Sequence, residues 1–278
     1  MSDLCGARLC LADAQGHKIY NSRSTAIIPY CNGFDNTLPL NFVILCGIII
    51  MYPYDAGGDM MRYRLAVFDF DLTLADSTKP ITECFKYTLD KFGYPPVPDE
   101  EIFATIGKTL PDSFDILTGI PNNPQREQMR VEYVKKADTV MAAGTEFYPD
   151  AIAILQILQN AGVKTAIVSS KMKYRIEETF MLHTGSVPVD LIIGLNDTAA
   201  PKPAPDGIIR AGEMLGVPLE DTLYIGDNLI DAETARNAGV DFAAVTTGST
   251  TREEFESLPH IYIGGSLLEI FTSINNNE

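Results

Sequence analysis

Polar side chains that could carry chemistry follow four separate apolar segments of the chain, each short enough to be a strand. They are carboxylates, hydroxyl groups and one ammonium group: Asp69, Asp71, Asp227, Ser169, Ser170 and Lys202. If the four segments are parallel strands of one sheet, their carboxyl ends meet at one edge, which is where open α/β sheets bind ligands. We therefore expect these side chains to converge on a single site.

The chemistry of such a site follows from its charge. Three aspartates crowded at one edge need a cation in order to coexist, and oxygen ligands without histidine or cysteine suit Mg²⁺. A phosphate group would complete the site, because Mg²⁺, the Lys202 ammonium and the Ser169 hydroxyl can all bind its oxygens. A carboxylate can attack phosphorus to form an aspartyl-phosphate. Asp69 and Asp71 could divide that work, one as the nucleophile and the other as the proton shuttle.

Apolar segments of strand length alternate with helical segments from residue 65 onward. A parallel sheet that is buried on both faces requires such near-continuous apolar strands, so the pattern predicts an α/β domain with an open parallel sheet. The predicted strands are residues 65–68, 165–168, 191–193, 223–225 and 242–245. Two of the intervening helices have clear ends: Asp150 can cap one that stops at Gly162, and residues 229–238 form another that ends at Gly239.

Residues 79–145 interrupt this alternation between the first and second strands and contain no strand signal. Apolar residues such as Ile81 and Phe85 recur there at helical spacing. Further helical stretches are expected at residues 100–106, 111–117 and 125–142. We predict a small helical domain inserted into a core domain of residues 61–78 and 146–278.

Residues 1–60 differ from the rest of the chain, because they contain no glutamate and show no sustained helical period. We interpret them as an N-terminal extension of uncertain role. It either pads the domain or reflects a start assigned upstream of a natural one at Met60 or Met61. The apolar run at residues 42–51 is half the length of about 20 residues that a membrane span needs. It predicts a buried strand or an interfacial segment.

The overall composition excludes several classes of function. Lys and Arg total 21 and Asp and Glu total 37, so the net charge is −16. The chain lacks the positive field that a nucleic-acid groove or a membrane-surface helix would need, and we expect neither as a partner. The five cysteines include no CxxC pair and the N-terminus opens polar, which indicates a reducing, cytoplasmic setting. The sequence gives no indication of the oligomeric state.

Four motifs of the haloacid dehalogenase-like hydrolases occur in order, and the chain resembles this superfamily from residue 61 to near its C-terminus. The motifs are DFDLTLADS at 69–77, IVSSK at 167–171, KPAPDG at 202–207 and GDNLID at 226–231. The helical insertion is similar to the C1 cap of the family, which closes over the site and excludes water. The resemblance implies a Rossmann-like open parallel sheet with an inserted helical cap, as in the phosphoglycolate phosphatases and pyrophosphatases of that branch.

The resemblance also implies a role for each residue that matches a motif. Asp69 would be the nucleophile and Asp71 the general acid/base. The phosphate-binding residues would be Thr73, Ser169, Ser170 and Lys202, and Thr73 would also brace the first loop. The ligands of Mg²⁺ would be Asp69, the backbone carbonyl of Asp71, Asp227 and, from nearby, Asp231.

The first motif departs from the family pattern at one position. The family commonly has glycine after the second aspartate, where this chain has Leu72. Glycine there eases the geometry of the loop. We expect Leu72 to adopt an ordinary backbone conformation, or the loop to adjust locally.

The Gly107-Lys108-Thr109 sequence within the insertion is not a P-loop. The first glycine of that motif would stand at position 102, which is Ile102, and no strand precedes it. The stretch resembles the specificity turn of the cap. Lys108 would either meet an anionic group of the substrate there or be a solvated turn residue.

These observations predict a Mg²⁺-dependent phosphatase that hydrolyses a small phosphorylated metabolite through an aspartyl-phosphate. Two reactions of the same fold stay open, those of a sugar phosphomutase and of an inorganic pyrophosphatase. Mutases of the family use a cap arginine and a histidine at positions that are Leu110 and Ile81 here, so water is the expected acceptor. A catalytically idle phosphate-binding module is a third alternative, and the intact motif residues argue against it.

Overall fold

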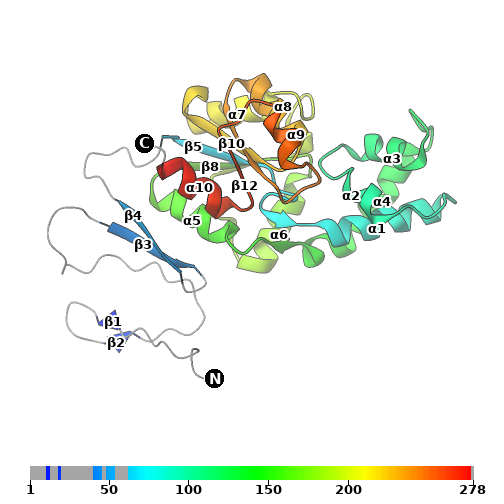
Figure 1. The fold of residues 1–278 in the computed structure, drawn as a ribbon. Helices are drawn as coiled ribbons and strands as arrows, with labels where there is room; N and C mark the ends of the chain where they lie inside the picture. The colour runs from blue at the N-terminus through cyan, green and yellow to red at the C-terminus, as the bar shows by residue number, and fades with distance from the viewer. Residues whose placement is uncertain (1–10, 13–17, 20–39, 46–47, 54–61, 277–278) are drawn as a thin grey trace. The chain divides into compact units, whose positions relative to one another are not determined.

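The computed structural model divides the chain into two compact units, Met1–Met60 and Met61–Glu278 (Figure 1). The structure describes residues 11–12, 18–19, 40–45, 48–53 and 62–276. Among these residues, no helix combines the length and the apolar character needed to cross a membrane.

The first unit contains two antiparallel strand pairs, β1 with β2 and β3 with β4. The strands are β1 (Leu11–Ala12), β2 (Lys18–Ile19), β3 (Leu40–Leu45) and β4 (Ile48–Pro53). The run at residues 42–51 was expected to be a buried strand or an interfacial segment, and it belongs to two strands rather than one, with Phe42 opposite Met51. Pairing within the run satisfies backbone groups that one isolated strand would leave open. The alternative starts at Met60 and Met61 lie outside the described residues.

The second unit is built on a six-stranded sheet in which every neighbouring pair is parallel, in the order β12-β11-β10-β5-β8-β9. The strands are β5 (Leu65–Phe68), β8 (Lys164–Val168), β9 (Leu191–Ile193), β10 (Thr222–Gly226), β11 (Asp241–Val245) and β12 (Tyr262–Gly264). The first five confirm the predicted strands; β12 was not predicted because its three residues are too few to show a pattern. The order reverses at β5, so the carboxyl ends of β5, β8 and β10 are adjacent.

Helices cover both faces of this sheet, which confirms the α/β fold class (Figure 1). The side chains of β5 alternate: Ala66 and Phe68 pack in one core with α5, α6 and α10, and Leu65 and Val67 pack in the other with α7, α8 and α9. The helices are α5 (Ala151–Asn160), α6 (Lys173–Thr184), α7 (Asp206–Leu215), α8 (Leu229–Ala238), α9 (Arg252–Glu256) and α10 (Leu267–Asn276). Two single 3₁₀ turns, η1 (Leu195–Asp197) and η2 (Leu219–Asp221), complete the connections.

Four helices form the insertion, and Figure 1 shows them as a lobe to one side of the sheet. They are α1 (Thr78–Lys91), α2 (Asp99–Phe103), α3 (Leu110–Thr118) and α4 (Arg126–Gly144). They enclose their own core, in which the Phe85 ring lies 5.1 Å from that of Phe114 and 4.8 Å from that of Tyr133. An antiparallel ribbon of β6 (Ala75–Asp76) and β7 (Glu146–Phe147) connects the insertion to the sheet. Strands of two residues carry no periodicity, so the sequence did not predict this ribbon.

The three predicted helix boundaries differ in outcome. Helix α5 stops just before Gly162, which has φ of 76°, as predicted. Gly239 ends α8 in the left-handed conformation, with φ of 72°, as predicted. Asp150 precedes α5 as predicted, but its side chain makes no capping hydrogen bond. Instead, its Oδ2 accepts a hydrogen bond from the backbone N–H of Leu268 at 2.8 Å. Asp150 therefore connects α5 to α10 rather than capping its own helix.

Candidate active site

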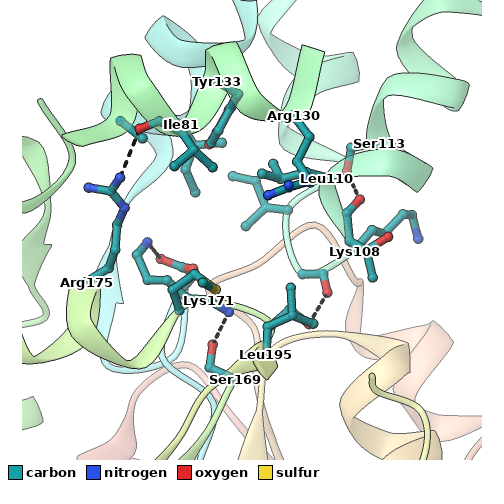
Figure 2. A pocket seen from close by; sticks show the side chains of 18 of the residues that line it. Ile81, Lys108, Leu110, Ser113, Arg130, Tyr133, Ser169, Lys171, Arg175 and Leu195 are labelled. Atoms are coloured by element: carbon teal, nitrogen blue, oxygen red, sulfur yellow. Dashed lines mark hydrogen bonds and ion pairs between the residues drawn. The ribbon is translucent and has the colours of Figure 1, made fainter. Parts of the chain in front are cut away.

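A cavity of about 560 Å³ opens at the carboxyl ends of β5 and β8, between the sheet and the helical insertion (Figure 2). Asp69, Asp71 and Ser169 line it from the sheet, and residues of α1 and α4 line it from the insertion. This is the edge at which the sequence predicts the site, because the reversal of strand order leaves a crevice there.

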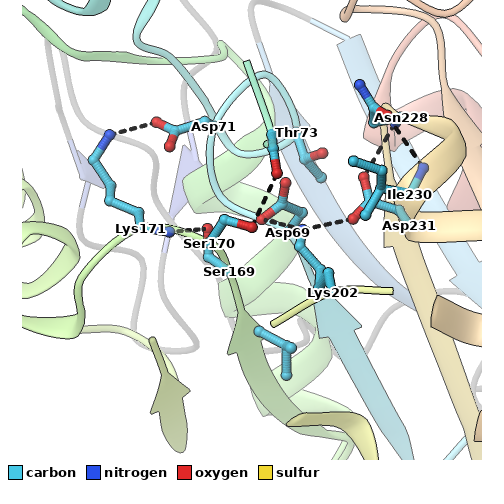
Figure 3. Close-up of polar contacts among 12 residues, drawn as sticks. Asp69, Asp71, Thr73, Ser169, Ser170, Lys171, Lys202, Asn228, Ile230 and Asp231 are labelled. Carbon is cyan, nitrogen blue, oxygen red and sulfur yellow. Dashed lines mark hydrogen bonds and ion pairs between the residues drawn. The ribbon is translucent and has the colours of Figure 1, made fainter. Parts of the chain in front are cut away.

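Asp69 stands at the end of the central strand, where its side chain is buried. Its backbone N–H donates to the carbonyl of Ile225 at 2.9 Å, which extends the pairing of β5 with β10 by one residue. The Nζ atom of Lys202 lies 3.1 Å from Asp69 Oδ1 (Figure 3). The strand pairing therefore fixes a carboxylate directly beside a buried ammonium.

Two further aspartates surround this pair. Asp69, Asp227 and Asp231 are buried, and each places a carboxylate oxygen within 4.8 Å of the others. The Thr73 hydroxyl donates to Asp227 Oδ1 at 2.8 Å, and Lys202 Nζ donates to Asp231 Oδ1 at 2.6 Å. The structure thus brings together three of the four aspartates that the sequence proposed as metal ligands.

Burial dominates the electrostatics of this cluster. Burial is the largest influence on Asp69, and its pKa is raised to about 6. The Lys202 ammonium opposes this shift without cancelling it. Burial, and then the charges of Asp231 and Asp69, hold the pKa of Asp227 well above its usual range. Burial alone would lower the pKa of Lys202, but the carboxylates of Asp231 and Asp69 raise it above its ordinary value. One ammonium faces three buried carboxylates, so an additional cation would be stabilising.

The donor atoms of the cluster fit Mg²⁺. They are all oxygens, which Mg²⁺ prefers. Apart from its 3.1 Å ion pair with Lys202, Asp69 Oδ1 accepts no hydrogen bond from the described residues, which leaves a lone pair for a metal ion. Gly248 packs so close that a Cβ atom there would lie 2.0 Å from Asp227 Oδ2, which leaves room for glycine alone. Asp231 is more occupied, because the Tyr224 hydroxyl donates to its Oδ1 at 2.9 Å in addition to Lys202.

The side chain of Asp71 lies apart from this cluster. Its Oδ1 is 2.5 Å from Lys171 Nζ, whose side chain is only 7% exposed and lies over the Phe70 ring (Figure 3). The sequence did not predict a role for Lys171. Its position two residues after Ser169, at the end of the neighbouring strand, is the signal that could have indicated one.

The two predicted serine hydroxyls point to different partners. Ser169 Oγ accepts a hydrogen bond from the backbone N–H of Lys171 at 3.2 Å and lies at the edge of the cavity. Ser170 Oγ donates to the carbonyl of Gly107 at 2.9 Å, in the insertion. Asn228 Nδ2 donates to the neighbouring carbonyl of Ile106 at 3.4 Å. These two contacts between the sheet domain and the insertion were not predicted.

Of the two alternatives expected at Leu72, the ordinary backbone conformation is wrong. Leu72 adopts the left-handed conformation, with φ of 61°, that the glycine of the family pattern would permit. Its side chain is 2% exposed and packs in the core of the insertion. The Thr247 hydroxyl donates to its carbonyl, and its own N–H donates to the Ala75 carbonyl at 2.7 Å. These contacts hold a backbone conformation that costs a non-glycine residue about 1–2 kcal/mol.

Comparison with a family model decides the affiliation of this site. The model of the haloacid dehalogenase-like hydrolases matches residues 66–245, which include every candidate site residue described above. The chain belongs to this family. The resemblance inferred from the four motifs is therefore confirmed.

Relatives of this haloacid dehalogenase-like hydrolase include two curated bacterial proteins. The phosphoglycolate phosphatase of Rhodobacter capsulatus is 31% identical over 199 residues, 70% of this chain and 89% of that protein. The pyrophosphatase PpaX of Oceanobacillus iheyensis is 27% identical over 217 residues, 78% of this chain and 99% of that protein. A solved haloacid dehalogenase-like hydrolase of Bacteroides fragilis is 42% identical, with a TM-score of 0.73 over 75% of this chain and 99% of that one.

Proposed function

We propose that this hydrolase is a Mg²⁺-dependent phosphatase that releases inorganic phosphate from a small phosphorylated metabolite through an aspartyl-phosphate on Asp69. The observation that carries the proposal is the buried contact of Asp69 with Lys202, 3.1 Å apart, beside the carboxylates of Asp227 and Asp231. A carboxylate fixed next to an ammonium can attack a phosphoryl group whose charge that ammonium neutralises.

In the first half of the reaction, a carboxylate oxygen of Asp69 attacks phosphorus. The bond from phosphorus to the alcohol oxygen breaks as the new phosphorus–oxygen bond forms. Asp71 donates a proton to the departing alcohol oxygen. Lys202 and Ser169 bind the non-bridging oxygens of the phosphoryl group, which leaves an aspartyl-phosphate and a free alcohol.

In the second half, a water molecule attacks the phosphorus of the aspartyl-phosphate. Asp71 takes a proton from that water, the bond from phosphorus to Asp69 breaks, and inorganic phosphate leaves. Lys171, 2.5 Å from Asp71, holds the shuttle carboxylate at the cavity. Asp69 and Asp71 thus return to their starting protonation states, and the net reaction consumes one water.

Thr73 and Ser170 have supporting roles in this scheme. The hydroxyl protons of both are donated within the protein, to Asp227 and to the Gly107 carbonyl respectively. Thr73 therefore braces the first loop against β10, as the family resemblance implies. Ser170 holds the insertion against the sheet domain.

Mg²⁺ would be held by Asp69, Asp227 and the backbone carbonyl of Asp71, with Asp231 supporting from nearby. When bound, it supplies charge neutralisation for the phosphoryl group and for the carboxylates. Asp231 orients Lys202 through their 2.6 Å contact, which keeps the ammonium beside Asp69.

The helical insertion acts as a cap in this proposal, with residues 79–145 closing over a core of residues 61–78 and 146–278. Closure limits the water in the cavity to the molecule that is needed for the second half of the reaction. The contacts of Ser170 and Asn228 with the carbonyls of residues 106–107 support this role, because they connect the cap turn to the edge of the sheet.

Water is the proposed acceptor rather than a sugar phosphate. Ile81 and Leu110, which occupy the positions that family mutases use for a histidine and an arginine, both line the cavity and can neither bind a second phosphate nor act on a proton. The names of the relatives, a phosphoglycolate phosphatase and a pyrophosphatase, also support cleavage of a phosphorus–oxygen bond by water.

The test measures inorganic phosphate released from p-nitrophenyl phosphate, first with Mg²⁺ and then with excess chelator. We expect turnover with Mg²⁺ and none without it. A parallel reaction supplies β-glucose 1-phosphate and measures glucose 6-phosphate. Isomerisation faster than phosphate release would overturn the proposal in favour of a mutase, and the absence of Mg²⁺-dependent phosphate release would overturn it altogether.

A further inference from the structure

The cavity is larger than the reacting phosphoryl group requires. Its volume of about 560 Å³ lies in the range of pockets that enclose drug-sized ligands. Asp69, Asp71 and Ser169 line only the end at the sheet, so the remaining space, under the cap, is available to the alcohol part of the substrate. Side chains from α1 and α4 line that space: Ile81, Phe85, Val134, Ala137 and Met141.

Three of the four basic residues that line the cavity already have carboxylate partners. Lys171 contacts Asp71, and Arg175 contacts Asp138. Arg130 makes a two-point contact with Glu127, from Nε at 2.8 Å and from Nη2 at 2.6 Å. These pairings leave little net positive charge at the cap end for a second anionic group of a substrate, although Arg175 Nη1 is buried without a hydrogen-bond partner.

Lys108 has no carboxylate partner among the described residues. Figure 2 shows its side chain extending away from the centre of the cavity. Of the two alternatives for Lys108, this direction favours the solvated turn residue. Lys108 therefore places no ammonium at the centre of the cavity.

Tyr133 is the one cavity-lining tyrosine of α4, and its hydroxyl makes no hydrogen bond with any described residue. The residue is 6% exposed, and Figure 2 shows the side chain descending from α4 toward Ile81. Its ring is held by Phe85 at 4.8 Å and by Phe114 at 6.2 Å, so the hydroxyl has a fixed position. The hydroxyl is not among the buried unpartnered atoms, so it is accessible from the cavity and can donate a hydrogen bond to an acceptor of a ligand.

We propose that the alcohol part of the substrate is an uncharged, largely apolar group, larger than a two-carbon chain, that accepts a hydrogen bond from Tyr133. This inference rests on the proposed phosphatase function and names the substrate class of the same site. The apolar group lies against Val134, Ala137 and Met141 while its phosphate lies at Asp69. Phosphoglycolate and pyrophosphate, which are small and carry a second anionic group, do not belong to this class.

The test compares kcat/KM for phosphate monoesters whose alcohols have similar acidity, so that the chemical step is comparable. The probes are ethyl phosphate, 2-phenylethyl phosphate and 2-(4-methoxyphenyl)ethyl phosphate, together with phosphoglycolate and pyrophosphate. We expect the phenylethyl ester to exceed the ethyl ester by about tenfold or more, because an apolar pocket discriminates by that much for even small apolar groups. The methoxy oxygen should add a further gain of about fivefold through Tyr133.

Three variants identify the origin of these preferences. Tyr133→Phe keeps the ring and removes the hydroxyl, so the advantage of the methoxy ester over the phenylethyl ester should disappear. Ala137→Leu fills the apolar wall, so the ratio of phenylethyl to ethyl ester should fall. Val131 lies on the same helix and is 40% exposed, so Val131→Ala is the matched control. It should leave the ratio of methoxy to phenylethyl ester and the ratio of phenylethyl to ethyl ester at the wild-type values.

The outcomes separate this inference from the proposed function. A higher kcat/KM for phosphoglycolate or pyrophosphate than for the phenylethyl ester would overturn the inference while supporting a phosphatase. A methoxy advantage that persists in Tyr133→Phe would overturn the assignment of the hydroxyl. No phosphate release from any probe with Mg²⁺ would overturn the proposed function, and this inference with it.

Discussion

Asp69 and Asp71 are two residues apart in the chain, yet their surroundings differ. Asp69 is 2% exposed and faces Lys202 and two other carboxylates, whereas the Asp71 side chain faces the cavity and Lys171. The first position suits a nucleophile that must be fixed in place. The second suits a group that exchanges protons with a leaving alcohol and with water. The division of labour that we propose would therefore arise from the loop, since both residues are the same amino acid.

Substituting each aspartate separately tests this division. We expect Asp69→Asn to remove turnover without loss of the fold, because an amide of equal size is not nucleophilic. Asp71→Asn should lose roughly 10²–10⁴ in kcat, the usual contribution of general acid/base catalysis. Steady-state phosphate release measures both, and far-UV circular dichroism controls for folding. Near-normal activity of Asp69→Asn would contradict its role.

The left-handed conformation of Leu72 leads to a prediction about stability. Leu72→Ala should cost about 2–5 kcal/mol through loss of a buried side chain. Glycine is ordinarily about 0.5–1 kcal/mol less stable than alanine. At position 72 the order should reverse, because alanine retains the cost of about 1–2 kcal/mol for a positive φ.

Urea unfolding of the two Leu72 variants measures this difference. Leu74, which is fully buried and is not among the residues with positive φ, is the matched control position. There the alanine variant should be the more stable of the two. If Leu72→Gly unfolded at lower urea than Leu72→Ala, the backbone explanation would be wrong.

At the scale of elements, the cap turn and the edge of the sheet meet through a few hydrogen bonds. Ser170 Oγ donates to Gly107, where φ is 95°, and Asn228 Nδ2 donates to Ile106. Arg175 of α6 also contacts Asp138 and the Val134 carbonyl of α4. In the proposed function, the two bonds at the cap turn would form as the cap closes over the substrate. The core of the cap, formed by Phe85, Phe114 and Tyr133, moves with it as one body in this view.

Removing one of these contacts should weaken closure. Ser170→Ala deletes a hydrogen bond that contributes about 1 kcal/mol, which corresponds to roughly a fivefold change in an equilibrium constant. We expect kcat/KM to fall by about that factor. Ser170→Thr, which keeps the hydroxyl, should retain most of the activity. Equal kinetics for the alanine variant and the wild type would show that this bond does not contribute to closure.

At the scale of the whole molecule, the parts that local sequence determines were predictable. The apolar runs gave the strands that carry Asp69, Ser169 and Asp227, and the parallel order then brought those residues to one edge. Contacts between distant segments were not predictable. The partners of Lys171 and Ser170 are Asp71 and Gly107, which no local pattern connects to them. The same holds for Asp150, whose carboxylate binds a helix more than a hundred residues later in the chain.

The excess of buried carboxylates should also be visible in the stability of the whole chain. Burial raises the pKa of Asp69 from 3.8 to about 6, so the folded, metal-free protein binds more protons than the unfolded chain between these pH values. Protonation of Asp69 therefore favours the folded state at low pH, and this contribution to the free energy of unfolding decreases as the pH rises from 3.8 to about 6. Above pH 6, binding of Mg²⁺ to the folded protein should restore the stability that is lost when Asp69 ionises.

We therefore expect Mg²⁺ to raise Tm more at pH 7.5 than at pH 5. Differential scanning fluorimetry with and without Mg²⁺ at both pH values measures the difference. Asp227→Asn, which removes one proposed ligand, should reduce the shift at pH 7.5. A shift of the same size at both pH values would argue against a metal site made of these carboxylates.

The measurement that most directly tests the account is chemical trapping of the phosphorylated residue. The protein is quenched in acid during turnover of p-nitrophenyl phosphate with Mg²⁺ and treated with borohydride, which reduces an aspartyl-phosphate to homoserine. Peptide mass spectrometry then locates the reduced residue. We expect homoserine at position 69, and none when Mg²⁺ is omitted. Reduction at Asp71, or no reduced aspartate during active turnover, would contradict it.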